Sequence, residues 1–193
     1  SNYATSDRLF ARADGNEVIL LRFGLQGQVP TSARLVDARL ELYAASSYSA
    51  GSVELGLYAL QREWFENQAT WQTARNGVSW ARAGAAAAGS DYSNEQAAFQ
   101  TVRYTPRWVT FDVTALTRDW LSGARPNYGV VLRSSGLAGM ETYFWSSQYY
   151  RRADDRPRLV ITYELPAEAD ATPTASAPAT PTVSATPPAT ATP

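Results

Sequence analysis

The sequence predicts an all-β fold: a jelly-roll-like sandwich of two sheets, followed by an extended Pro/Thr-rich C-terminal tail. Short stretches in which apolar and polar residues alternate recur along residues 1–165, and Gly, Asn, Asp and Pro residues separate them. From residue 166 onward the composition changes abruptly to Pro, Thr, Ser and Ala. We therefore expect a β-sandwich domain over residues 1–165 and an extended tail over residues 166–193.

The alternation is cleanest in the second half of residues 33–44, where Leu40 and Leu42 alternate with charged residues. Successive side chains of a strand point to opposite faces, so this pattern predicts one buried and one solvent-facing surface. Strands are expected over residues 8–13, 17–24, 33–44, 52–60, 101–113, 128–134, 142–146 and 158–163.

One short helix is expected over residues 114–121. Asp112 or Thr114 can cap its first turn, because each side chain offers an oxygen to free backbone N–H groups. Gly123 is expected to end the helix, because Gly readily adopts the left-handed conformation of a C-cap. Residues 84–94, with a run of four Ala flanked by Gly, are expected to form a long surface excursion.

The composition excludes several kinds of chemistry. The chain contains no Cys, no His and no Lys, and all 17 of its basic residues are Arg. It therefore lacks the usual ligands of zinc, haem and iron–sulfur clusters, the imidazole base of common catalytic triads, and the Schiff-base amine. We expect no cofactor and assign no metal. The net charge of −1 and the scattered Arg residues argue against a nucleic-acid partner.

The location is expected to be extracellular or at the cell surface. No apolar run approaches the roughly 18 residues that span a bilayer, so no membrane span is expected. The chain opens on Ser-Asn-Tyr-Ala-Thr without a signal peptide, a start that a secreted protein presents once its leader has been cleaved. The Ser/Thr/Pro-rich tail is similar in composition to the O-glycosylated stalks of extracellular proteins.

The tail cannot bury enough apolar surface to fold alone, so by itself it is expected to be disordered or a loose polyproline II strand. The chain contains no Asn-X-Ser/Thr sequon, so attached sugars are expected to be O-linked. The expected O-glycosylation sites are Thr172, Thr174, Ser176, Thr180, Thr182, Ser184, Thr186, Thr190 and Thr192.

Five segments together carry a family resemblance: residues 20–25 (LLRFGL), 30–46 (PTSARLVDARLELYAAS), 58–71 (YALQREWFENQATW), 111–135 (FDVTALTRDWLSGARPNYGVVLRSS) and 156–163 (RPRLVITY). Taken together they resemble the DNRLRE-type extracellular β-sandwich modules, a group that overlaps a family of non-catalytic carbohydrate-binding modules. The resemblance implies a jelly-roll sandwich, secretion, attachment to surface proteins or polysaccharide-active enzymes, and no catalytic residues.

The chain departs from this family pattern at its start. Members place a strand before the Asn-Tyr-Gly-type segment that residues 2–4 resemble, and here the chain begins at that segment. A missing edge strand would leave unpaired backbone groups and an open apolar seam, which invites a strand from another molecule. The alternative is that this strand is dispensable.

Two aromatic clusters are candidates for a binding site. The first contains Trp64, Glu66, Thr70 and Trp71, which either stack against sugar rings or plug the core; the family framework favours the core role. The second lies in residues 143–150. Its candidate tail- or glycan-binding residues are Tyr143, Trp145, Tyr149 and Tyr150. Alternation puts the first two of these on one strand face, with plain packing as the alternative role.

A catalytic role is not expected. Asp154-Asp155 and Glu63/Glu66 are the nearest carboxylate pairs of the kind that glycoside hydrolysis requires. The first pair lies among four Arg residues, which is typical of a solvated turn, and nothing else in the sequence supports an enzyme.

The sequence thus predicts a secreted, non-catalytic structural subunit that self-assembles head to tail into an extracellular glycosylated fibre. The C-terminal tail of one copy would dock on the next copy, because such heterologous contacts propagate into filaments. Its partners would be copies of itself and covalent O-glycans. The alternative is a carbohydrate-binding module on a glycosylated stalk, with a polysaccharide as its partner. A cell-surface adhesion module with the tail as a spacer is a third interpretation.

Overall fold

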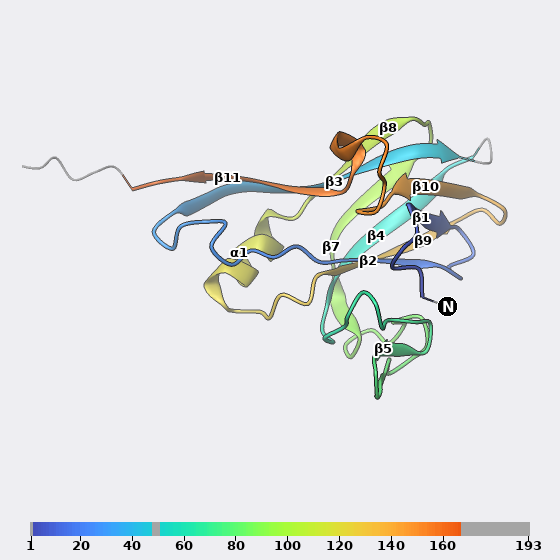
Figure 1. Cartoon of the computed structure of the whole chain (residues 1–193), viewed down its shortest axis with the longest axis horizontal. Helices are drawn as coiled ribbons and strands as arrows, with labels where there is room; N and C mark the ends of the chain where they lie inside the picture. Colours follow the sequence, from blue (N-terminus) through green and yellow to red (C-terminus); the bar gives the residue numbers. More distant parts are fainter. Residues whose placement is uncertain (1, 48–50, 167–193) are drawn as a thin grey trace, which may run out of the picture.

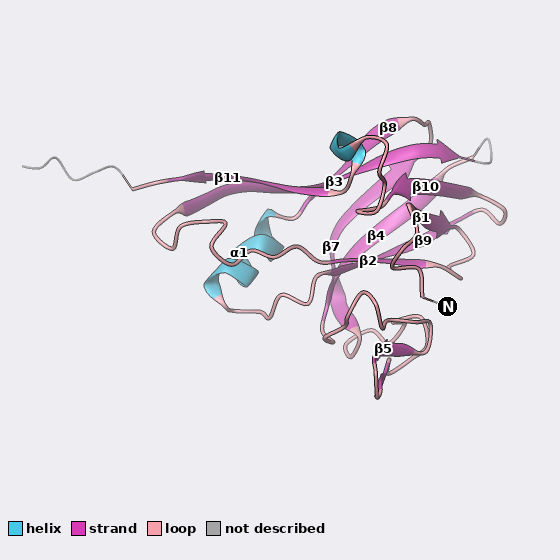
Figure 2. Ribbon diagram, in the orientation of Figure 1, coloured by secondary structure: helices cyan, strands magenta, loops and turns pink. Residues whose placement is uncertain are grey.

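Two antiparallel sheets pack face to face in the computed structural model, which describes residues 2–47 and 51–166 (Figures 1 and 2). The first sheet contains β1 (Arg8–Arg12), β3 (Arg34–Ser47), β8 (Arg107–Asp112), β10 (Glu141–Trp145) and β11 (Arg158–Glu164). The second contains β2 (Val18–Leu21), β4 (Val53–Leu60), β7 (Tyr92–Val102) and β9 (Val130–Gly136). A small pair, β5 (Thr73–Arg75) and β6 (Val78–Ser79), lies in the segment that follows β4. The predicted all-β sandwich is confirmed.

The long strand β3 organises the first sheet. One of its edges pairs with β10 and β11, and the other pairs with β8. Strand β1 pairs with β10, its only partner among the described residues. In the second sheet the order is β2-β9-β4-β7. Whether a neighbouring molecule adds a strand at an edge stays a prediction.

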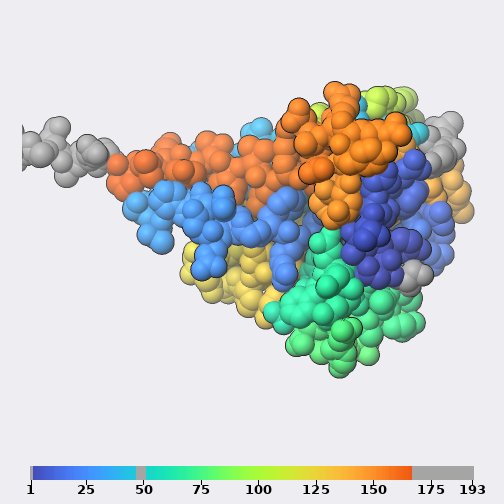
Figure 3. Space-filling model, in the orientation of Figure 1, coloured from blue at the N-terminus to red at the C-terminus, as the bar shows by residue number. Residues whose placement is uncertain are grey.

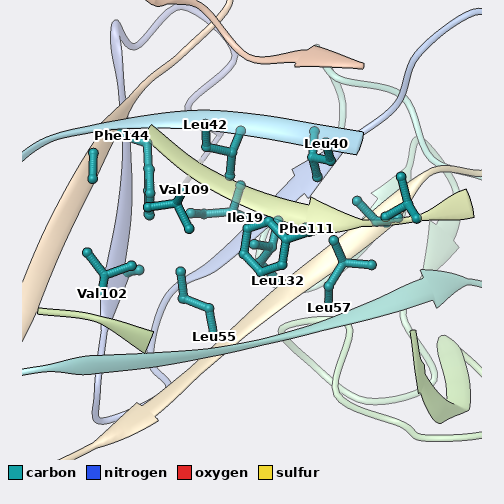
Figure 4. Packing of buried hydrophobic residues seen from close by; sticks show 14 of the residues in the cluster. Ile19, Leu40, Leu42, Leu55, Leu57, Val102, Val109, Phe111, Leu132 and Phe144 are labelled. Carbon is teal, nitrogen blue, oxygen red and sulfur yellow. The ribbon is translucent and has the colours of Figure 1, made fainter. Parts of the chain in front are cut away.

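The core lies between the two sheets (Figure 4). Leu40 and Leu42 point into it from β3, as the alternation predicted, and meet Phe111 and Phe144 of the same sheet and Leu57 of the other. All five side chains are almost completely buried, so the period-two pattern of the sequence corresponds to one inner face per sheet.

The predicted helix is confirmed as α1 (Thr114–Ser122). Asp112 contributes to its start, because its Oδ1 accepts a hydrogen bond from the backbone N–H of Thr114 at 2.9 Å. Gly123 ends it in the left-handed conformation, with a φ of 75°. None of the helices in the described residues is long and apolar enough to cross a membrane.

Two predictions between residues 84 and 113 are wrong. The single strand expected over residues 101–113 is divided, because β7 ends at Val102 and β8 begins at Arg107 in the opposite sheet. The surface excursion expected over residues 84–94 includes the start of β7 at Tyr92 and several buried residues. Strand β7 lies at a sheet edge and exposes mostly polar side chains, so it lacks the apolar alternation that identifies a strand.

A second, smaller core lies outside the second sheet. Residues 61–91 fold back over its outer face and place Trp64 and Trp80 against Leu60 and Val131. We call this segment the covering segment. Figure 3 shows it in teal and green on one side of the molecule, with the orange segment before β11 on the opposite side. The covering segment therefore forms a surface separate from the outer face of the first sheet.

Residues 167–193 lie outside the described residues, and with them lie the nine predicted O-glycosylation sites. The predicted docking of the tail lies outside them as well.

Candidate functional site

The aromatic residues predicted at positions 143–149 do come together, on the outer face of the first sheet. Phe144 points into the core, so its neighbours Tyr143 and Trp145 point outward. Their ring centroids lie 5.3 Å apart in an edge-on contact, and Trp145 stacks in parallel on Tyr149 at 3.9 Å. Phe10 of β1 extends the row, with its centroid 5.9 Å from that of Tyr143.

The aromatic rings of this row mostly pack against one another. Tyr149 is only 7% exposed, and its stacking covers one face of Trp145. The guanidinium carbon of Arg8 lies 4.9 Å from the Tyr143 centroid and 6.0 Å from that of Trp145. These contacts favour packing over binding for three of the four predicted residues. The fourth, Tyr150, stands apart and exposed beside Arg151.

The same face carries a second aromatic pair that sequence reasoning did not single out. Tyr43 of β3 and Trp108 of β8 meet at 5.3 Å. The guanidinium carbon of Arg158 lies 4.3 Å from the Trp108 centroid, while its Nε donates to Glu41 at 2.6 Å. An ion-paired Arg thus covers one face of the Trp108 ring, which leaves little of that ring for a ligand.

The covering segment separates the two Trp residues of the other predicted cluster. Trp64 is buried, and its indole N–H donates to the backbone carbonyl of Tyr128 at 2.8 Å. It is a core residue, as the sequence favoured. Trp71 instead remains 38% exposed, and its indole N–H has no hydrogen-bond partner among the described residues. Trp71 is therefore only partly buried, and part of its ring surface is accessible to solvent or to a ligand.

The Trp71 ring lies directly on Gly84. A Cβ atom at Gly84 would come within 2.5 Å of the ring, closer than real side chains approach. Gly84 also has a φ of 75°, which Gly adopts without strain. Both the backbone and the ring contact therefore require Gly at this position, and the backbone beneath the ring supports its inner side.

The loop that presents Trp71 is held by hydrogen bonds at both ends. Thr70 Oγ1 accepts from the backbone N–H of Thr73 at 3.0 Å, and the Thr70 carbonyl accepts from the Trp80 indole at 2.9 Å. The Gly84 N–H donates to the Trp71 carbonyl at 2.6 Å. A ring held in this way loses little freedom when a ligand binds to it.

The N-terminal segment lies against this loop. The side-chain amide of Asn2 donates to the backbone carbonyls of Glu66 at 2.7 Å and Ala69 at 2.6 Å. Tyr3, which follows it, is 72% exposed. A second exposed aromatic residue is thus tied to the segment that contains Trp71.

Asp91 fixes the far end of the covering segment, and sequence reasoning missed it. Its completely buried carboxylate accepts hydrogen bonds from the Arg62 side chain at 2.9 Å and from three backbone N–H groups, those of Ala81, Arg82 and Ala87. Burial alone would raise the pKa of Asp91, but these hydrogen bonds to the charged form outweigh it and lower the pKa below its ordinary value.

The two carboxylate pairs that could suggest catalysis do not form a catalytic pair. In each pair, one carboxylate lies close to an Arg side chain. Asp155 is buried and lies 3.4 Å from Arg152, so the expectation that both Asp residues face solvent is wrong; only Asp154 is exposed. Glu63 lies 3.5 Å from Arg75. Within residues 2–47 and 51–166, no three acidic side chains gather in a way that could hold a metal ion.

The comparisons identify the family. The model of carbohydrate-binding module family 96 matches residues 1–163, and the chain belongs to this family. The match supports a binding module rather than an enzyme, with a glycan or polysaccharide as its partner. It confirms the carbohydrate-binding part of the resemblance and leaves the DNRLRE-type assignment untested. A search of curated proteins gives no significant match.

Proposed function

We propose that this chain is a non-catalytic module that holds a polysaccharide against the exposed ring of Trp71. The family supports a carbohydrate ligand. The location of the binding site rests on the Trp71 ring, which is exposed and packs against Gly84. Sugar rings present apolar C–H faces that pack on aromatic rings, and Trp offers the largest such surface.

Two polar residues close in sequence to Trp71 or Gly84 can hydrogen-bond to sugar hydroxyls. Gln72 follows Trp71 directly, and Arg82 lies two residues before Gly84. Both are exposed, and their side chains have no hydrogen-bond or ion-pair partner among the described residues. A polysaccharide can use these groups without breaking an existing contact, so little is lost on binding.

The fibre predicted from the tail is a finer proposal that stays a prediction. The tail lies outside the described residues, and no observation in the sandwich favours self-assembly. An extracellular location and O-glycans on the tail likewise remain predictions. The location and the O-glycans are compatible with a carbohydrate-binding module on a glycosylated stalk, which is the alternative to the fibre.

The test compares Trp71→Ala with Tyr150→Ala. Tyr150 is a matched control, because it is an exposed aromatic residue outside the covering segment. After a panel of neutral and acidic polysaccharides has identified one that the native chain binds, the affinity of both variants is measured by calorimetry. Loss of a central aromatic contact costs about 2 kcal/mol or more, so Trp71→Ala should weaken binding about 30-fold.

The control variant should bind like the native chain. Thermal unfolding of both variants verifies that they are folded. Equal affinity of Trp71→Ala and the native chain, or a larger loss in Tyr150→Ala, would place the polysaccharide elsewhere and refute the proposal.

A further inference from the structure

A hollow of about 470 Å³ lies beside the covering segment, away from Trp71. One wall comes from the two ends of the covering segment, with Gln61 and Ser90. The other comes from the loop between α1 and β9, with Arg125, Pro126 and Tyr128. Trp71 does not line it. The volume falls in the range of small-molecule sites, which is roughly 300–1,000 Å³.

The walls carry hydrogen-bonding groups that the protein itself does not use. The hydroxyls of Ser90 and Tyr128 have no hydrogen-bond partner among the described residues. The Arg125 Nε is ion-paired with Asp119 at 3.7 Å, which is longer than a hydrogen bond, so the guanidinium N–H groups can still donate to a ligand. The Gln61 amide nitrogen can donate to the carbonyls of Tyr92 and Gly89, which leaves its oxygen to accept.

Backbone contacts hold both walls in place. The Gln61 N–H donates to the Asp91 carbonyl at 2.9 Å, and the Leu60 N–H donates to Gly129 at 2.9 Å. On the other side, the Tyr128 carbonyl accepts from the Trp64 indole at 2.8 Å. The unused side-chain groups therefore project from fixed backbone, as expected of a preformed site.

We infer that this hollow binds one sugar residue at the end or branch of a glycan, as a subsite separate from the Trp71 ring. Four side chains that donate or accept, those of Gln61, Ser90, Arg125 and Tyr128, lie beside the flat surfaces of Pro126 and the Tyr128 ring. This combination matches a ligand with many hydroxyls and apolar C–H faces. The choice of a sugar rests on the proposed function.

The test uses free monosaccharides, which are too small to need both sites. Glucose, galactose, mannose and xylose are each titrated into the ¹⁵N-labelled full chain. For at least one of them, the backbone amide signals of Ser90 and Arg125 should shift with saturation. The double variant Ser90→Ala/Tyr128→Phe removes only two unused hydroxyls and should remain folded. Each lost hydrogen bond should weaken monosaccharide binding about threefold to tenfold.

The matched control is Ser147→Ala/Tyr104→Phe, which removes two exposed hydroxyls outside the hollow and should bind like the native chain. If none of the four sugars shifts these amide signals, or if the two double variants bind equally, the inference is wrong. Failure of the proposed function looks different: polysaccharide affinity would then be unaffected by Trp71→Ala, whatever the monosaccharide titrations show.

Discussion

Asp91→Ala is expected to lower the free energy of unfolding by about 3–5 kcal/mol, because it leaves the Arg62 charge and three backbone N–H groups without their shared partner. The covering segment should loosen first, since Asp91 joins its beginning to its end. Urea unfolding followed by Trp fluorescence measures the effect. Asp154→Ala is the control, because that carboxylate is exposed, and its stability should match the native chain. Equal stability of the two variants would contradict this role of Asp91.

The pH dependence gives the same prediction a second readout. The folded state depresses the pKa of Asp91, so its contribution is fully present above the unfolded value of about 3.9. It is lost as the pH falls through the lower folded value. Below about pH 4, the native chain should therefore lose stability more steeply than Asp91→Ala. Parallel stability curves for the two proteins would show that this carboxylate is not linked to folding.

Gly84→Ala is expected to weaken polysaccharide binding about as strongly as removal of the Trp71 ring, although the ring itself is kept. The added methyl group would meet the ring at 2.5 Å, so the ring must leave its present position. Gly77→Ala is a matched control: Gly77 also has a φ of 75°, but a Cβ there meets no atom within 4 Å. The two variants share the backbone strain and differ in the ring contact.

Calorimetric titration of both Gly variants with the same polysaccharide separates the two effects. Gly77→Ala should keep native affinity and lose only some stability from its left-handed backbone. Equal affinities for Gly84→Ala and Gly77→Ala would mean that the position of the Trp71 ring does not matter to the ligand.

Most of the sandwich could be predicted from sequence because its inner faces follow a period of two. Residues 33–44 illustrate this. The helix α1 was predictable for a different local reason, which is its apolar spacing and the Gly that ends it. The edge strand β7 could not be found this way. Its position depends on pairing with β4, and its exposed face gives no apolar pattern.

The candidate site was only partly predictable. Sequence reasoning identified Trp71 as an aromatic residue in a polar context, but it could not separate it from Trp64, because exposure is decided by how the covering segment folds back. The sequence pattern places Gly84 and Asp91 in a surface excursion. Their roles come from contacts with residues up to 29 positions away, such as Arg62, and a single sequence carries no signal of such pairs.

The most direct measurement of the Trp71 account follows the indole N–H signals of the six Trp residues by NMR. An oligosaccharide of the bound polysaccharide is titrated into the ¹⁵N-labelled full chain, with the Trp71 signal assigned from Trp71→Ala. The Trp71 signal should shift most. The signals of Trp64 and Trp80, whose indole N–H groups donate to the backbone carbonyls of Tyr128 and Thr70, should stay nearly constant. A shift of the Trp108 or Trp145 signal with an unchanged Trp71 signal would contradict the account and place the ligand on the outer face of the first sheet.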